Sequence, residues 1–102
     1  MTALKKLMVP KKKIVDLCKR WQIREFSFFG SIVGDSFTEA SDVDVLIRFD
    51  RSTHLGLFEI EAIREELEAL LGRPVDIVEM DAVKNPYRRA AILASHEVLY
   101  AA

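Results

Sequence analysis

The alternating run from Asp42 to Phe49, DVDVLIRF, limits the possible folds of this sequence more than any other segment. Alternation of apolar and polar residues is typical of a β-strand with one face in a core, because successive side chains of a strand point to opposite sides. We expect one face to carry Val43, Val45, Ile47 and Phe49, and the other to carry Asp42, Asp44, Leu46 and Arg48. The segment therefore predicts a sheet with an apolar inner face and two carboxylates at the start of its other face.

Two further strands and three helices are predicted around this strand. Apolar residues recur at helical spacing in the helices, and Gly or Pro residues mark the ends of several segments. The expected strands are Glu25–Phe29 and Val75–Glu79. One expected helix begins at Pro10, a second spans Leu57–Leu71, and a third runs from Pro86 to about Ser95. This order of elements predicts an α+β (α/β-like) domain.

The buried sides of these elements follow from the spacing of their apolar residues. In the last strand we expect Val75 and Ile77 to face inward. The expected core positions of the helices are Ile14, Leu17, Cys18 and Trp21 in the first, Leu57, Ile60, Ile63, Leu67, Leu70 and Leu71 in the second, and Tyr87, Ala90, Ala91 and Ala94 in the third. His54 and His96 lack a second metal-binding residue at suitable spacing, so we expect them in a loop and at a helix end.

Length, charge and cysteine count narrow the class of protein. The 102 residues predict one domain, 1–102, in which residues 1–9 form a flexible or loosely packed N-terminus. The 15 Lys and Arg residues nearly balance the 16 Asp and Glu residues, which argues against a nucleic-acid partner. We expect a solvated face or a frayed terminus, with contact to an acidic partner as the alternative, for Lys5, Lys6, Lys11, Lys12 and Lys13. A single cysteine excludes an internal disulfide, and the apolar runs near the N-terminus are too short for a signal peptide or a membrane span, so we expect a cytoplasmic protein without a membrane partner.

Three aspartates occupy positions in the expected strands, where Asp is disfavoured. Asp42 and Asp44 share one face of an extended strand, with about 6 to 7 Å between them along the chain. Carboxylates at that spacing suit Mg²⁺, which is often shared with substrate phosphates. Asp76, on the neighbouring expected strand, has the right parity to add a third carboxylate and complete a paired-metal site.

A Gly-Ser pair stands where the first expected strand ends. Gly30 lets the chain turn without a side chain in the way, and backbone amides and a hydroxyl at such a turn can hold a phosphate. Ten residues separate Ser31 from Asp42, enough for the chain to fold back and bring the turn and the two aspartates to the same end of neighbouring strands. Phosphates bound there would have donors on one side and metal ions on the other.

These residues resemble the GSx10DxD signature of the minimal nucleotidyltransferases (MNT), small members of the DNA polymerase beta superfamily. The signature corresponds to FGSIVGDSFTEASDVDVLIRF, and similarity continues through GLFEIEAIREELEALLGRPVDIV, NPYRRAAIL and VLY, from about Ile14 to Tyr100. The resemblance implies a polymerase-beta-type fold, a small mixed β-sheet flanked by helices.

The resemblance also implies a function. It implies transfer of a nucleoside monophosphate, AMP from ATP or the equivalent from another NTP, to a hydroxyl group with two Mg²⁺ ions. Asp42, Asp44 and Asp76 would be the catalytic metal ligands, and Gly30 and Ser31 would hold phosphates. Members of this family often serve as antitoxins of HEPN-domain toxins, so a HEPN-type toxin is the expected partner.

The sequence departs from this family at one position of the turn. Relatives often carry Arg where Gly34 stands, and a guanidinium there can bind phosphate through two hydrogen bonds. Arg48 and the lysines near Ile14 are candidates to replace it. A second hypothesis is therefore a noncatalytic antitoxin or binding module that inhibits its partner by occlusion. A third is transfer to nucleic acid or to a small-molecule hydroxyl, for which the predicted domain has no added binding module.

Overall fold

The computed structural model describes residues 2–50 and 56–102, so His54 lies outside the described residues. In chain order the elements are α1 (Ala3–Leu7), α2 (Lys11–Arg20), β1 (Ile23–Phe29), β2 (Val43–Phe49), α3 (Leu57–Leu71), β3 (Val75–Glu79), α4 (Pro86–Ala94) and β4 (His96–Ala101). Two short 3-10 turns, η1 (Gly30–Ile32) and η2 (Met80–Ala82), follow β1 and β3. None of the described helices is both long and apolar enough to cross a membrane.

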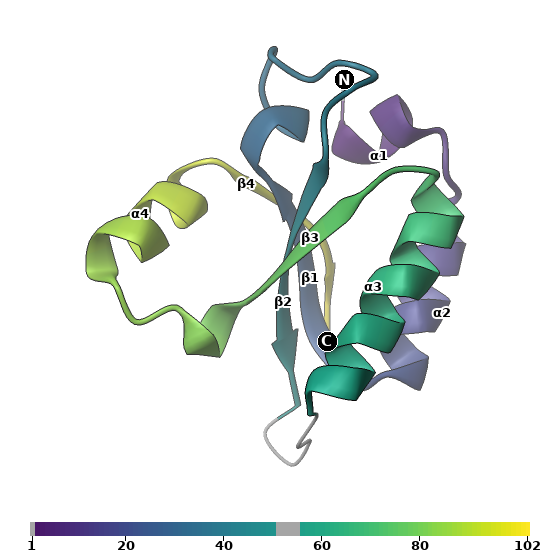
Figure 1. The fold of residues 1–102 in the computed structure, drawn as a ribbon, viewed down its shortest axis with the longest axis vertical. Coiled ribbons are helices and arrows are strands. Elements are labelled where there is room, and N and C mark those ends of the chain that lie inside the picture. The colour runs from purple at the N-terminus through teal and green to yellow at the C-terminus, as the bar shows by residue number, and fades with distance from the viewer. Residues whose placement is uncertain (1, 51–55) are drawn as a thin grey trace.

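The four strands form one mixed sheet in the order β3-β2-β1-β4. Strand β1 is antiparallel to both β2 and β4, whereas β2 and β3 are parallel and are joined through α3. Figure 1 shows α2 and α3 together on one side of this sheet and α4 on the other. The expected α+β fold with a small mixed sheet is confirmed.

The predicted apolar face of β2 lies in the main core. Val43, Val45 and Ile47 have no exposed surface and belong to the same cluster as the buried residues of α1, α2 and α3. Leu46, on the opposite face, is also buried, because η2 and α4 cover it. The smaller cluster on that side contains Leu46, Val78, Met80, Val83 and Ile92.

Two of the predicted helix ends are confirmed by their caps. Gly72 ends α3 with φ +68°, in the left-handed region, and its amide donates to the carbonyl of Glu68 at 2.8 Å. At the start of α4, the side chain of Asn85 accepts hydrogen bonds from the amides of Tyr87 and Arg88, and Pro86 occupies the first helical position.

The predicted packing side of α4 is wrong. Tyr87, Ala90, Ala91 and Ala94 are all exposed, and the helix contacts the sheet through Ile92 instead. Arg89 adds a hydrogen bond from Nη1 to the carbonyl of Met80 at 3.2 Å. Because α4 stands beside the sheet rather than lying flat on it (Figure 1), most of its surface faces solvent.

The core stripe predicted for α3 begins too early. Leu57 is 84% exposed at the first turn of the helix, whereas Ile63, Leu67 and Leu71 are buried as expected. The helix meets the sheet only from its second turn onward, so its first turn extends beyond the core.

The N-terminal helix and the C-terminal strand are packed more closely than the sequence predicts. Helix α1 buries Ala3 and Leu7 in the main core, which contradicts the expected loose packing of the N-terminus. The amide of Ala3 donates to both carboxylate oxygens of Glu97 on β4, at 3.2 Å each. Strand β4 itself was not predicted, and it occupies the edge of the sheet beside β1.

Candidate active site

The turn η1 at the end of β1 is held by backbone contacts and depends on a glycine. Gly30 has φ +76°, in the left-handed region that favours glycine. The amide of Val33 donates to the carbonyl of Gly30 at 3.1 Å, and the amide of Gly34 donates to that of Ser31 at 3.2 Å. Ile32 is fully buried and anchors the turn, while Ser31 stays half-buried. The pair predicted to bind phosphate thus lies on a fixed turn.

Asp44 lies on β2, between the Gly30 turn at the end of β1 and the neighbouring strand β3. Its sheet partners are Phe29 on β1 and Asp76 on β3. A Cβ atom on Gly30 would stand 2.3 Å from Oδ2 of Asp44, so the carboxylate packs directly against the backbone of the turn. The structure therefore brings together Gly30, Asp44 and Asp76 at one end of three neighbouring strands.

The carboxylate group of Asp44 is in an unfavourable environment for its charge. Burial raises its pKa above the ordinary value, and the negative charges of Asp76 and Asp42 raise it further. Asp42 lies just before β2 and, like Asp76, is exposed. Within residues 2–50 and 56–102, no Lys, Arg or His forms an ion pair with any of the three. A bound cation would relieve this uncompensated negative charge.

The donor chemistry of these aspartates fits Mg²⁺ that arrives with a nucleotide. Among the described residues, no three His, Cys, Asp or Glu side chains lie close enough to enclose an ion by themselves. A Mg²⁺ ion shared with phosphates needs only one or two protein carboxylates, because phosphate oxygens and water complete its shell. Asp42, Asp44 and Asp76 suit such a shared site better than a permanent site made of protein ligands alone.

Two cations that sequence analysis left without a specific role bind the loop after η1. Nζ of Lys6 donates to the carbonyls of Ile32 and Gly34, at 2.7 and 2.8 Å. Arg73 donates to carbonyls further along the same loop. The expectation of a solvated Lys6 is therefore wrong. Its partners lie 26 and 28 residues away, and no local sequence pattern signals a contact at that separation.

The missing arginine of the turn has no replacement from β2. Gly34 is exposed, and no atom lies within 4 Å of the place its Cβ would take. Arg48 is turned to other partners, with Nη1 3.3 Å from a carboxylate oxygen of Glu25 and Nε 3.6 Å from one of Asp81. The groups of the turn that could bind a phosphate are thus its backbone amides and the Ser31 hydroxyl. The space beside Gly34 is open and could hold a guanidinium group.

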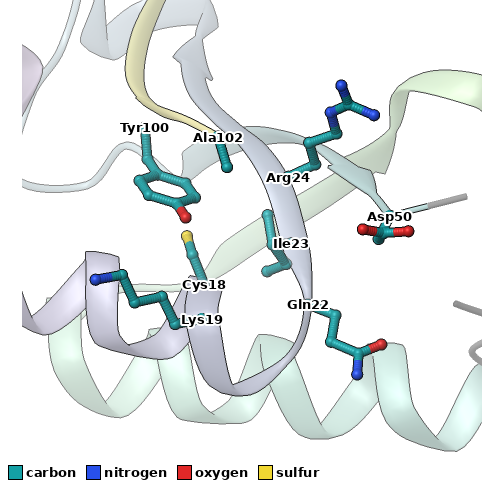
Figure 2. A pocket seen from close by; sticks show the side chains of 8 residues that line it. All are labelled: Cys18, Lys19, Gln22, Ile23, Arg24, Asp50, Tyr100 and Ala102. Atoms are coloured by element: carbon teal, nitrogen blue, oxygen red, sulfur yellow. The ribbon is translucent and has the colours of Figure 1, made fainter. Parts of the chain in front are cut away.

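A cavity of about 530 Å³ lies at the opposite end of the strands from these aspartates. Figure 2 shows Tyr100 pointing its hydroxyl toward the sulfur of Cys18, and Ile23 and Asp50 also line the cavity. Burial raises the pKa of Cys18 to about 12, so this thiol is protonated and packs as a core residue. The cavity shares no residue with the aspartate cluster.

Comparisons with known proteins agree with the resemblance seen in the sequence. Residues 11–99 match the family described as nucleotidyltransferase domain. The protein adenylyltransferase MntA of Thermococcus cleftensis is 39% identical over 85 residues, which cover 83% of this chain and 81% of that protein. A solved structure assigned as a minimal nucleotidyltransferase is 30% identical, with a TM-score of 0.71, and the match covers 96% of this chain and 94% of that one.

Two toxin–antitoxin structures share the fold at lower identity. One, determined with AMP-PNP, has a TM-score of 0.76 at 17% identity and covers 92% of this chain and 75% of that one. The other contains a tri-AMPylated HEPN toxin of Shewanella oneidensis with its MNT antitoxin, and has a TM-score of 0.67 at 16% identity over 90% of this chain and 70% of that one. At these identities the likeness concerns the fold alone.

Proposed function

This chain belongs to the nucleotidyltransferase domain family, and from that premise we propose that it transfers AMP from ATP to a hydroxyl group of a HEPN-type toxin and so acts as its antitoxin. The observation that carries the proposal is the position of Asp44, with Asp76 beside it and the Gly30 turn against its carboxylate. The relative from Thermococcus cleftensis bears the name protein adenylyltransferase, and a structural neighbour contains an AMPylated HEPN toxin, which together favour this substrate and partner.

The proposed reaction is a displacement at the α-phosphorus of ATP. The acceptor oxygen forms a bond to the α-phosphorus. The bond between the α-phosphorus and the oxygen that bridges it to the β-phosphorus breaks, and pyrophosphate leaves with that electron pair. Asp76 accepts the proton of the hydroxyl, because an exposed carboxylate at the cluster is open to an acceptor. The turn at Gly30 and Ser31 holds the departing phosphates through its backbone amides and hydroxyl.

Two Mg²⁺ ions would be held by Asp42, Asp44 and Asp76. When bound, Mg²⁺ neutralises charge on the leaving pyrophosphate and lowers the pKa of the attacking hydroxyl. Asp44 is central to this arrangement, since it pairs with Asp76 in the sheet and follows Asp42 by two residues. The proposed compartment is the cytoplasm, which supplies ATP and suits the unpaired thiol of Cys18.

A noncatalytic antitoxin is the second candidate, and the bare Gly34 is the observation that favours it. A turn without the guanidinium common in relatives holds phosphate less firmly, while the folded domain could still cover a toxin surface. The two functions differ in whether neutralisation of the toxin depends on Asp44.

Incubation with α-labelled ATP, Mg²⁺ and a candidate HEPN-type toxin tests the proposal. We expect mass spectrometry to find added AMP on a hydroxyl residue of the partner, and no addition with Asp44→Asn. Asp16→Asn, an exposed aspartate on α2, serves as the matched control and should transfer like the unchanged protein. A stable complex that takes no label from any NTP, and a toxin still neutralised by Asp44→Asn, would establish occlusion instead.

A further inference from the structure

Arg73 reaches from the end of α3 to the loop that leads into β2. It lies between Gly72, which caps α3, and Pro74, which precedes β3, and it is half-buried. Its Nη1 donates to three backbone carbonyls of the loop, at 2.9, 3.1 and 3.3 Å, those of Thr38, Glu39 and Ser41. One guanidinium nitrogen therefore binds three carbonyls of the backbone segment immediately before Asp42.

The same loop has two more contacts with this region. The guanidinium carbon of Arg73 lies 4.4 Å from the centre of the Phe37 ring, a cation–π contact. The amide of Val43 donates to the carbonyl of Pro74 at 3.0 Å. The backbone on either side of Asp42 is thus tied to the two residues before Val75.

No acidic side chain forms an ion pair with Arg73 in the described part of the chain. Its charge is directed to carbonyl oxygens and to an aromatic face, which makes it a clamp on the loop and not one half of a salt bridge. Several bonds from one planar group hold a loop in one arrangement more firmly than a single contact can.

We propose that Arg73 is a positioning residue for nucleotidyl transfer, which fixes Asp42 relative to Asp76. This inference rests on the proposed function. Asp76 follows Arg73 by three residues, and Asp42 follows the clamped carbonyl of Ser41 directly, so the clamp joins the two segments that carry these carboxylates. Lys6 holds the phosphate turn separately through Ile32 and Gly34, so loss of Arg73 should disturb the aspartates more than the turn.

The test compares Arg73→Ala and Arg73→Lys with the unchanged protein. Arg20→Ala is the matched control, because Arg20 is an exposed arginine that contacts Glu66 away from the loop. Two readouts are needed. The first is the Mg²⁺ dependence, kcat and KM for ATP of AMP transfer, and the second is amide hydrogen exchange of residues 36–43 without Mg²⁺ or nucleotide.

With Arg73→Ala we expect kcat to fall by about 10- to 100-fold, as for a misplaced catalytic group, and KM for ATP to change by less than about threefold. The Mg²⁺ concentration for half-maximal rate should rise roughly tenfold, since Asp42 is no longer held in place relative to Asp76. Exchange of the Val43 amide should quicken. Arg73→Lys should recover part of each effect, and Arg20→Ala should match the unchanged protein.

A wild-type Mg²⁺ dependence together with wild-type exchange at Val43 in Arg73→Ala would overturn the positioning role. If the unchanged protein transfers no AMP, the proposed function fails, and the exchange of Val43 still decides whether Arg73 holds the loop. If Arg73→Ala does not fold, Arg73→Gln replaces it, because glutamine keeps one donor and loses the charge.

Discussion

The backbone of Gly30 lies against the carboxylate of Asp44 so closely that a methyl group on the glycine would stand 2.3 Å from Oδ2 of the aspartate. The same glycine has φ +76°, which side chains of L-residues rarely tolerate. Glycine is thus required at this turn for two separate reasons, and only one of them concerns backbone conformation. The other is the space that Asp44 occupies.

We expect Gly30→Ala to impair both stability and AMP transfer. The left-handed conformation alone costs about 1–2 kcal/mol with a Cβ atom, and the overlap with Asp44 adds to that cost. Gly72→Ala is the matched control, because Gly72 has φ +68° with no atom within 4 Å of a Cβ. Urea unfolding should show the larger loss for Gly30→Ala, and only that variant should lose activity, by about tenfold or more. An equal loss in the free energy of unfolding for the two variants would show that the Asp44 side chain moves aside for the methyl group at no cost.

Asp44→Asn should stabilise the protein at neutral pH when Mg²⁺ is removed by a chelator. Because burial and two neighbouring carboxylates raise the pKa of Asp44 in the folded state, its ionised form is disfavoured there. Protonated Asp44 stabilises the folded state relative to ionised Asp44. This stabilisation is complete at pH values below the pKa of Asp44 in the unfolded chain, and it is lost as the pH rises through the pKa of Asp44 in the folded protein. The Tm of Asp44→Asn should therefore exceed that of the unchanged protein at pH 7, and the two should converge in acid.

Mg²⁺ provides the complementary measurement for Asp44. Added ions should raise the Tm of the unchanged protein, because they bind the folded cluster, and should do so much less for Asp44→Asn. Asp16→Asn should respond to Mg²⁺ like the unchanged protein. A Tm that falls at neutral pH on loss of the Asp44 charge would contradict the environment described for this carboxylate.

Gly34→Arg should strengthen nucleotide binding without loss of stability. The position is open, and its carbonyl can keep the bond to Lys6 whatever side chain is present. A guanidinium beside the phosphates adds charge-assisted hydrogen bonds, so KM for ATP should fall roughly fivefold. Gly34→Gln, which is long and neutral, separates the effect of charge from that of size. An unchanged KM in Gly34→Arg would place residue 34 away from the bound phosphates.

Cys18 should resist alkylation in the folded protein. Its pKa of about 12 leaves roughly one thiolate in ten thousand at pH 8, and burial blocks access as well. Iodoacetamide should therefore modify the native protein at least about a thousandfold more slowly than the protein in urea. Rapid modification without denaturant would show that the cavity beside Tyr100 opens to solvent.

The sequence predicts the central strands and α3 well, because their signals are local. Alternation along β2 gives both its faces, and Gly72 marks the end of α3. The adjacency of Asp44 and Asp76 also follows from parity in neighbouring strands, and the register confirms this placement. The catalytic roles of these residues stay predictions.

Other features depend on contacts between distant segments. Strand β4 follows α4 without a Gly or Pro between them, so no residue marks the change of structure. The three alanines of α4 do not define a packing side by their spacing, and among the residues of this helix only Ile92 is buried. Lys6 and Arg73 contact residues that lie 26 to 35 positions away along the chain. Their acceptors are backbone carbonyls, which every residue has, so the side chains of the contacted residues give no signal of these bonds.

The hydrogen bonds between the Ala3 amide and the Glu97 carboxylate bear on the order of events during protein synthesis. A ribosome extends a chain by about 5–20 residues each second, and a domain generally folds as a unit. Helix α1 emerges first but gains this partner only after residue 97 has left the exit tunnel. The contact of α1 with Glu97 therefore forms only once β4 is available, and a nascent chain stalled before β4 would expose the edge of β1 that this strand covers.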